Sequence, residues 1–217
     1  MQGIERSRIS TIALSWFGAI CRLEQGLLHF VEKADLGVAP EDREGFALVW
    51  HREIFRHAAR GYQPWTDMVL DALDSTFRRH RRKPLDVSPD DLEDQMPTWP
   101  LPPDSLALAK LGARFKLAVI SQMDSSLLAA CLHTVPRRFD YLIGSDYSRS
   151  FKPAFGYFRL LSPQFSLEEP DELLVVSTSR EIDLSPAEAQ GHQIAHVRWQ
   201  EDDLAAPDIP TLTELVA

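Results

Sequence analysis

Polar residues that directly follow short apolar runs are the candidates for chemistry in this chain. Ser15 follows the run at positions 9–14, and Gly18 after it marks a tight turn. Ser121 follows a second run at 117–120. Short apolar runs bounded by turn residues predict buried strands, so both hydroxyls are expected at strand ends. A serine hydroxyl is a weak nucleophile without a neighbouring base, and Ser15 therefore needs a partner.

Strands and helices alternate along the second half of the chain. Such alternation predicts an α/β fold, with a parallel sheet covered by helices on both faces. Strands are predicted at 9–14, 116–120, 139–143, 173–176 and 193–197, and helical segments at 125–132, 155–161 and 187–191.

The stretch from about residue 26 to 82 follows a different pattern. Its apolar residues recur at spacings of three and four, which predicts two or three long helices. The proline-rich segment 96–103 ends it, because each proline lacks a donor and restricts its predecessor. We expect an α/β core at 1–20 and 98–217, with a helical cap at 21–97. This cap would stand over the carboxyl end of the first strand, where open α/β sheets bind ligands.

Composition and charge exclude several function classes. The 217 residues are 44% hydrophobic and 25% charged, as in ordinary globular proteins. A net charge of −9 argues against nucleic acid or an anionic membrane as partner. The basic run at 78–83 is expected to be a solvated helix end, with an anion or partner patch as the alternative. No apolar run approaches the ~20 residues of a membrane span, and no signal peptide is expected, so a cytoplasmic protein is predicted.

The two cysteines, Cys21 and Cys131, lie far apart and beside apolar residues. Both are expected to be reduced core residues rather than a disulfide. Neither belongs to a Cys-x-x-Cys pair, so the spacing predicts no metal site.

Four segments share a pattern that extends over most of the chain. A strand end runs into a glycine turn at 14–20, and a second strand ends in Ser121. Lys152 precedes a proline, and a last strand end at 175–179 precedes Asp183. In this order and spacing the segments resemble the motifs of the haloacid dehalogenase (HAD) superfamily. The resemblance implies a Rossmann-like core with a cap inserted after the first strand. Five aromatic or histidine residues further resemble the type II 2-haloacid dehalogenase branch, namely Trp50, His51, Tyr62, Trp65 and Trp99.

The resemblance also identifies what this chain lacks. In that family an aspartate at the end of the first strand is the nucleophile that forms a covalent ester, and Ser15 stands at its position. Phosphatase relatives hold magnesium and move protons with further aspartates, at the positions of Phe17 and Thr178. We therefore expect neither phosphoryl transfer nor dehalogenation, and we predict no metal or cofactor.

Ser121 and Lys152 match the family motifs that bind an oxyanion and neutralise charge beside the nucleophile. Without a carboxylate at position 15, Lys152 would be a buried unpaired charge, which is costly. Asp183 is expected to compensate it. Three roles stay open. The pair could only satisfy two buried charges, it could act as an anion clamp or proton-moving lysine, or Lys152 could form a nucleophilic dyad with Ser15.

Five further residues are candidates for substrate binding through their place in these motifs. Gln122 could orient a ligand or cap the following helix. Trp16 could form a pocket wall or belong to the core. Arg22 could bind a carboxylate or lie at the surface of the cap hinge. Phe17 and Thr178 complete the set.

Three other residues have two interpretations each. Asp124 is expected to begin the following helix as its N-cap, with substrate binding as the alternative. His51 and His57 could face the pocket from the cap, but helical spacing explains them equally well.

Two function classes follow. The first is a repurposed, metal-independent enzyme (a lyase, isomerase or cyclase) that acts on a small anionic or carbonyl-bearing metabolite, with Lys152 and Ser121 stabilising negative charge. The second is a catalytically silent pseudoenzyme that binds a ligand or partner, and a hydrolase using Ser15 comes third. The enzyme requires an enclosed pocket that contains Ser15, Ser121 and Lys152 with a polar group positioned for proton transfer, whereas Trp16 or Phe17 filling that space favours the pseudoenzyme. The aromatic content of the cap also allows a homodimer.

Overall fold

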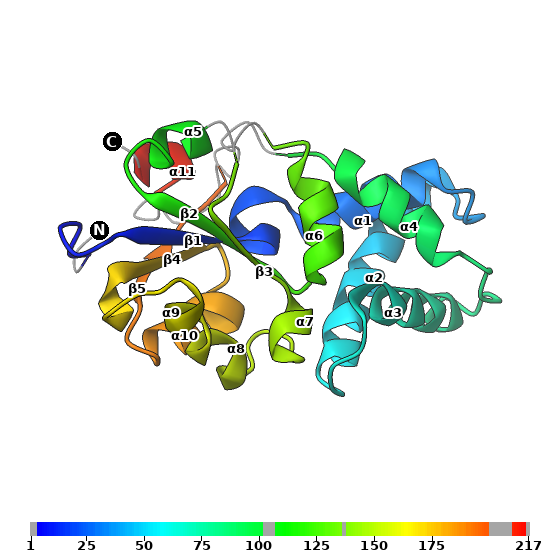
Figure 1. Cartoon of the computed structure of the whole chain (residues 1–217). Coiled ribbons are helices and arrows are strands. Elements are labelled where there is room, and N and C mark those ends of the chain that lie inside the picture. Colours follow the sequence, from blue (N-terminus) through cyan, green and yellow to red (C-terminus); the bar gives the residue numbers. More distant parts are fainter. Residues whose placement is uncertain (1–3, 102–106, 136–137, 200–209, 216–217) are drawn as a thin grey trace.

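Five short strands form one all-parallel sheet (Figure 1). The structure, a computed structural model, describes residues 4–101, 107–135, 138–199 and 210–215. All five predicted strands are present, and the first includes Ser15. The order across the sheet is β3-β2-β1-β4-β5, where the strands are β1 Thr11–Ser15, β2 Lys116–Ile120, β3 Tyr141–Ile143, β4 Leu173–Ser177 and β5 Gln193–His196.

Helices cover both faces of this sheet. They are α5 Leu108–Leu111, α6 Ser125–Leu132, α7 Ser145–Ser148, α8 Phe155–Arg159, α9 Leu161–Gln164, α10 Ser185–Glu188 and α11 Leu212–Leu215. Successive strand residues point to opposite faces. Ile12 and Leu14 pack in a large apolar cluster to which α5, α6 and α11 contribute. Ala13 lies in a smaller cluster with residues of α8, α9 and α10.

One predicted helix is divided in the structure. The pattern at 155–161 predicts a single helix, whereas α8 ends at Arg159 and α9 begins at Leu161. Pro163 accounts for the division, because it has no N–H to donate to the carbonyl of Arg159.

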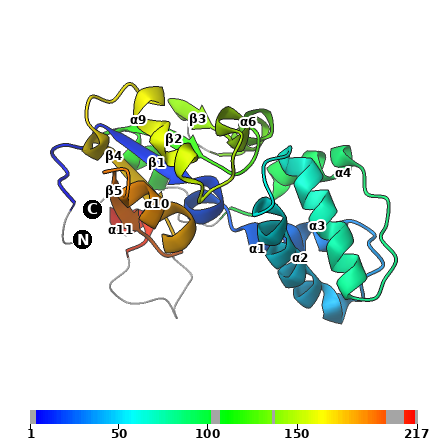
Figure 2. The same ribbon diagram turned by 90° about the horizontal axis from the view of Figure 1, so that it is seen from below.

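Four helices stand beyond the carboxyl ends of the strands (Figures 1 and 2). We call them the helical lobe, which consists of α1 Leu23–Lys33, α2 Arg43–Ala58, α3 Trp65–Arg79 and α4 Pro89–Gln95. The Trp50 indole of α2 donates to the Val69 carbonyl of α3 at 2.9 Å, which joins the two long helices. The short helix α4 was not predicted, although Ser88 and Asp91 form a capping box at its start. The predicted division into 1–20 with 98–217 and 21–97 stays a prediction.

Two connections join the lobe to the sheet. The first is the π-helical turn η1, Trp16–Ile20, and the second follows the short helix η3, Met96–Thr98. A Cβ at Gly26 in α1 would overlap the ring of Trp99. The Trp99 indole, on the returning connection, therefore packs directly on the backbone of α1.

The cysteines fit the prediction made from their neighbours. Cys21 and Cys131 are both buried free thiols. Within the described ranges, no helix combines the length and the apolar character that crossing a membrane requires.

Candidate functional site

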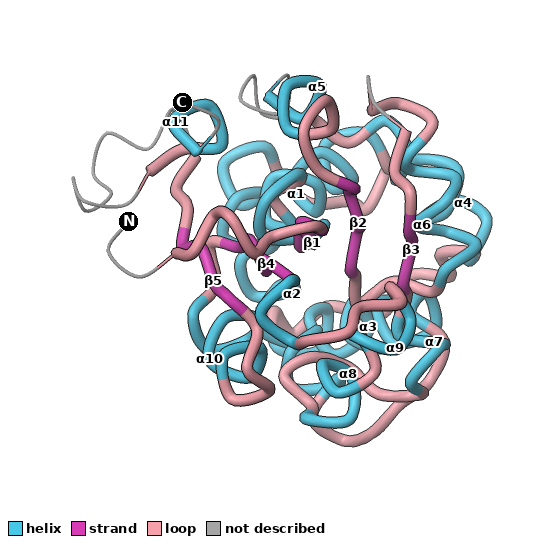
Figure 3. The backbone as a smooth tube through the Cα atoms, turned by 60° about the vertical axis from the view of Figure 1, so that its left-hand side comes forward, coloured by secondary structure: helices cyan, strands magenta, loops and turns pink. Residues whose placement is uncertain are grey.

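The candidate site lies at the carboxyl edge of the sheet, around its middle strand. β1 lies between β2 and β4 (Figure 3). The chain fills one side of β1 with β2 and β3 before it crosses to β4 and β5 on the other side. Such a switch point opens a crevice at the carboxyl ends of the strands. Ser15 and Ser177 are the last residues of the two strands that meet there.

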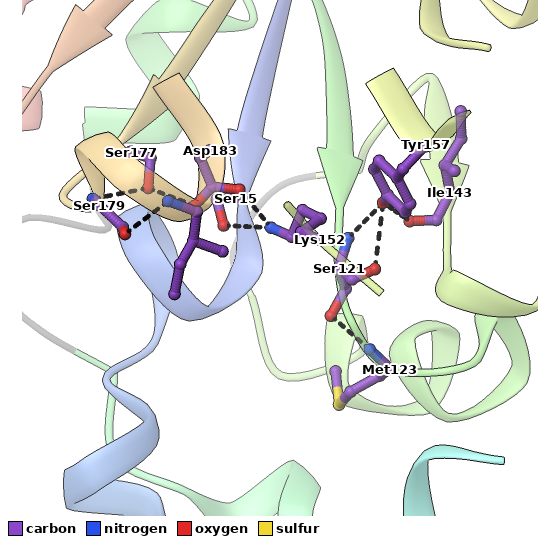
Figure 4. Close-up of polar contacts among 10 residues, drawn as sticks. Ser15, Ser121, Met123, Ile143, Lys152, Tyr157, Ser177, Ser179 and Asp183 are labelled. Carbon is purple, nitrogen blue, oxygen red and sulfur yellow. Dashed lines mark hydrogen bonds and ion pairs between the residues drawn. The ribbon is translucent and has the colours of Figure 1, made fainter. Parts of the chain in front are cut away.

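Lys152 and Asp183 form the predicted ion pair, and Ser15 joins it (Figure 4). The Lys152 Nζ donates to Asp183 Oδ1 at 2.6 Å and to Ser15 Oγ at 2.8 Å. The Ser177 hydroxyl donates to the other carboxylate oxygen of Asp183 at 2.7 Å. Lys152 is 3% exposed and Asp183 1% exposed, so each charge depends on the other for compensation.

The hydrogen bonds of Lys152 define what it can offer a ligand. Its two bonds use two of the three N–H groups of the ammonium. A carboxylate at 2.6 Å stabilises the charged form of the lysine. Among the described residues, one N–H group of Lys152 is therefore left for a ligand.

The absence of a side chain at Gly18 lets the turn η1 pack against the end of β4. A Cβ at Gly18 would overlap the Ser177 hydroxyl. The Gly18 carbonyl accepts a hydrogen bond from the Thr178 amide at 2.5 Å. This hydrogen bond joins the turn after β1 to the residue after β4.

Ser121 takes part in a separate group of hydrogen bonds (Figure 4). Its hydroxyl accepts from the Met123 amide at 3.0 Å, and its amide donates to the Tyr157 hydroxyl at 3.0 Å. Burial raises the pKa of Tyr157 well above its usual range, so this phenol stays neutral. The structure therefore brings Ser15, Lys152 and Asp183 together and leaves Ser121 outside their network.

A pocket of about 240 Å³ opens between this network and the helical lobe. Of the residues predicted for the site, six line it: Phe17, Arg22, Gln122, Lys152, Thr178 and Asp183. Ser15, Ser121 and Trp16 are not among the residues that line it. Trp16 is 2% exposed and belongs to the apolar core, which was one of the two places expected for this residue.

Phe17 does not fill the pocket. Its ring stacks on Trp65 of α3 with 5.3 Å between the ring centroids and lies 6.3 Å from Trp99. Phe17 is half-buried and forms part of the pocket wall. The pocket is therefore open, but of the three residues that the enzyme was expected to place in it, Lys152 alone is part of the lining.

Gln122 lines this pocket without a partner for its side-chain carbonyl. The residue is 4% exposed, and its Oε1 has no hydrogen-bond partner among the described residues. Buried polar atoms are nearly always paired, so this oxygen marks a place for a ligand group or a water molecule.

Several functional candidates were missed or left undecided by sequence reasoning. His51 of α2 and Glu24 of α1 both line the pocket, whereas His57 contacts Ser75 at 3.0 Å and is not part of the lining. Trp199 also lines the pocket, with the Arg22 guanidinium 5.2 Å from its ring centroid. Only His51 had a sequence signal, its place in the cap motif.

Asp124 begins α6, as predicted, but its carboxylate does not cap that helix. It accepts instead from the Trp65 amide at 2.7 Å and from the Tyr62 hydroxyl at 2.9 Å, both in or next to the helical lobe. The structure thus replaces the predicted local cap with a contact to another helix.

No family model matches the sequence, and no curated protein matches it. Solved structures do. The L-2-haloacid dehalogenase from Xanthobacter autotrophicus has a TM-score of 0.80 at 22% identity, over 96% of this chain and 97% of that one. This chain has the haloacid dehalogenase fold. A defluorinating L-2-haloacid dehalogenase gives 0.81 at 20% identity, over 96% and 94% of the two chains. The HAD-hydrolase YfnB from Bacillus subtilis, bound to magnesium, gives 0.74 at 12%, over 96% of each chain.

The residues of this HAD fold do not fit a magnesium ion. Magnesium prefers carboxylate oxygens and water, and Phe17 and Thr178 provide no carboxylate. Both oxygens of Asp183 are engaged, one by Lys152 and the other by Ser177. Across the described ranges, no group of three or more His, Cys, Asp or Glu side chains is arranged to hold a metal.

Proposed function

We propose that the pocket is the active site of a metal-independent enzyme of the lyase, isomerase or cyclase type. It would move a proton on a small metabolite that carries a carbonyl or carboxylate group. The observation that supports this proposal is the position of Lys152, a fixed cation in the wall of an open pocket between sheet and lobe.

The size of the pocket favours a small ligand. At about 240 Å³ it is below the ~300–1,000 Å³ of typical drug-sized ligand sites. Lys152 and Arg22 supply positive charge at its wall, and Gln122 supplies amide groups for hydrogen bonding. A carbonyl or carboxylate oxygen suits the remaining N–H of Lys152.

The chemistry follows from charge stabilisation. When a proton leaves a carbon next to a carbonyl, the electron pair of the C–H bond moves towards the carbonyl oxygen and makes it negative. A positioned cation stabilises this oxygen more strongly in the transition state than in the substrate. Lys152 would fill this role, and Asp183 and Ser15 would hold it in place.

A hydrolase using Ser15 receives less support. Ser15 is fully buried and does not line the pocket. Its hydroxyl accepts a hydrogen bond from a lysine that Asp183 keeps charged. A charged lysine cannot take the serine proton, so the dyad lacks its base.

Exchange of carbon-bound protons tests the proposal. The protein would be incubated in D₂O with pyruvate and 2-oxobutyrate, and NMR would follow deuterium entering the carbon next to the carbonyl. We expect the wild type to exchange these protons. Lys152→Met should lower the exchange rate at least about 100-fold, whereas the exposed control Lys116→Met should retain it. Because Lys152→Met leaves Asp183 without its buried partner, Lys152→Arg serves as a charged second variant, and circular dichroism checks that both variants fold. If neither acid binds and neither exchanges its carbon-bound protons, the proposal is overturned.

A ligand-binding pseudoenzyme is the second candidate. The observation that favours it is the orientation of Ser15 and Ser121, whose hydroxyls bond within the protein and do not line the pocket. This candidate predicts that a 2-oxo acid binds, measured by calorimetry, and that no carbon-bound proton exchanges. Exchange above the buffer rate would exclude it.

A further inference from the structure

We infer that His51 is the group that accepts the proton in this pocket and that Glu24 positions it. The inference rests on the proposed function and deepens it, because Lys152 alone provides a cation and no base. It assigns the base to the helical lobe and the cation to the sheet edge.

The position of His51 supports this role. Its side chain is 19% exposed and lines the same pocket as Lys152. The ring meets Phe55 edge to face, with centroids 4.9 Å apart and an interplanar angle of 88°. Phe55 also lines the pocket, so the histidine ring has a fixed orientation in its wall.

The contact with Glu24 distinguishes the two ring nitrogens of His51. The Nε2 atom lies 3.3 Å from Glu24 Oε1. A neutral ring with its proton on Nε2 keeps a lone pair on Nδ1. Among the described residues, the Glu24 carboxylate is the charged group that contacts the ring, and it does so at Nε2. Glu24 would also stabilise the imidazolium that forms when Nδ1 accepts a proton.

The charges around His51 favour its neutral form. Burial lowers its pKa below the usual value, the nearby Arg52 lowers it further, and Glu24 opposes both. Other charged groups in the pocket wall are Arg22, Lys152 and Asp183. A neutral imidazole near pH 7 can act as a general base.

The proton transfer balances without a further reactant. The C–H bond next to the substrate carbonyl breaks, its proton forms a bond to His51 Nδ1, and its electron pair forms an enolate. The enolate oxygen lies against the Lys152 ammonium. When the proton on His51 Nδ1 is first replaced by one from solvent, delivery to the same carbon gives exchange, and delivery to a neighbouring carbon gives an isomer.

A matched pair of histidine variants tests the role of His51. His57 lies on the same helix, also has a lowered pKa, and bonds to Ser75. In the pyruvate exchange assay, His51→Gln should lower the rate at least about 100-fold, and His57→Gln should change it less than about threefold. Calorimetry should give His51→Gln an unchanged affinity for pyruvate. Exchange that survives in His51→Gln but is lost in Lys152→Met would overturn the inference and leave the proposed function intact.

The pH profile separates positioning by Glu24 from a structural role. A base works only when deprotonated, so the rate is lost as pH falls through the pKa of His51. Glu24 raises that pKa, and Glu24→Gln should therefore move the acid limb to lower pH. NMR titration of the His51 ring in the free protein should show the same shift without any substrate. An unchanged His51 pKa in Glu24→Gln would overturn this part of the inference.

Discussion

The Asp124 carboxylate accepts a hydrogen bond from the Trp65 amide at 2.7 Å, so an acid at the start of α6 caps the first residue of α3. The Asp146 carboxylate in turn accepts from the Ser125 amide of α6 at 2.8 Å. At the N-termini of both α3 and α6, the backbone amide therefore donates to a carboxylate that lies on another element. A negative charge there is favourable because of the exposed amides and the helix dipole. The contact of Asp124 with Trp65 joins the helical lobe to the sheet side of the pocket.

Removal of the Asp124 carboxylate should destabilise the protein. We expect Asp124→Ala to lower the free energy of unfolding by about 1–2 kcal/mol, the loss of a strong helix cap. Asp67→Ala is the control, because Asp67 lies in the first turn of the same helix and is exposed. Urea unfolding measures both variants. Equal losses would mean that the charge alone matters and that the contact between the two parts does not.

Tyr62 should make the stability depend on alkaline pH. Burial and its hydrogen bond to Asp124 raise the pKa of Tyr62 to about 12 in the folded protein. The unfolded chain loses this proton near pH 10. Stability from Tyr62 is therefore complete below pH 10 and is lost as the pH rises towards 12. The free energy of unfolding should fall more steeply over this range in the wild type than in Tyr62→Phe, and parallel curves would contradict the assignment.

The Lys152–Asp183 pair should show strong coupling in a double-mutant cycle. Lys152→Met leaves Asp183 as an uncompensated buried charge, for which a loss of about 3–5 kcal/mol is typical. Combining Lys152→Met with Asp183→Asn should lose less than the sum of the single variants. The exposed pair Arg180–Glu188, at 3.5 Å, is the control, and its coupling should be close to zero. Urea unfolding measures all variants, and additive losses at 152 and 183 would refute a paired state.

Both thiols should be unreactive in the folded protein. Burial raises the pKa of Cys131 to about 12 and that of Cys21 even further. Only the thiolate attacks a disulfide reagent, so Ellman's reagent at neutral pH should label neither residue until guanidinium unfolds the chain. Cys21→Ser tells the two apart, because Cys21 lies in the pocket wall. If the wild type is labelled fast and Cys21→Ser is not, the reagent reaches Cys21 through the pocket.

Local pattern was sufficient to predict most of the sheet. β2 and α6 have the predicted bounds, because apolar runs and turn residues determine both. The division between α8 and α9 could be predicted only by considering that Pro163 cannot donate to the carbonyl of Arg159, four positions earlier. Helix α4 was missed because seven residues show too little periodicity, although Ser88 and Pro89 gave a start signal.

The candidate site was predictable only in part. The pairing of Lys152 with Asp183 followed from the cost of a lone buried charge. The orientation of Ser121 did not, because the Met123 amide two residues away binds its hydroxyl. The part of His51 in the pocket depends on how α2 packs on α1 and on where the lobe meets the sheet. The periodicity of the sequence predicts neither the packing of these two helices nor the position of the lobe on the sheet.

The packing of Trp99 on Gly26 has a consequence for how relatives of this chain can vary. Any side chain at position 26 would overlap the indole, so a larger residue there requires a smaller one at 99. The two positions should therefore change as a pair among homologues. A sequence that carries alanine at 26 and keeps tryptophan at 99 should have a different approach of the returning connection to α1.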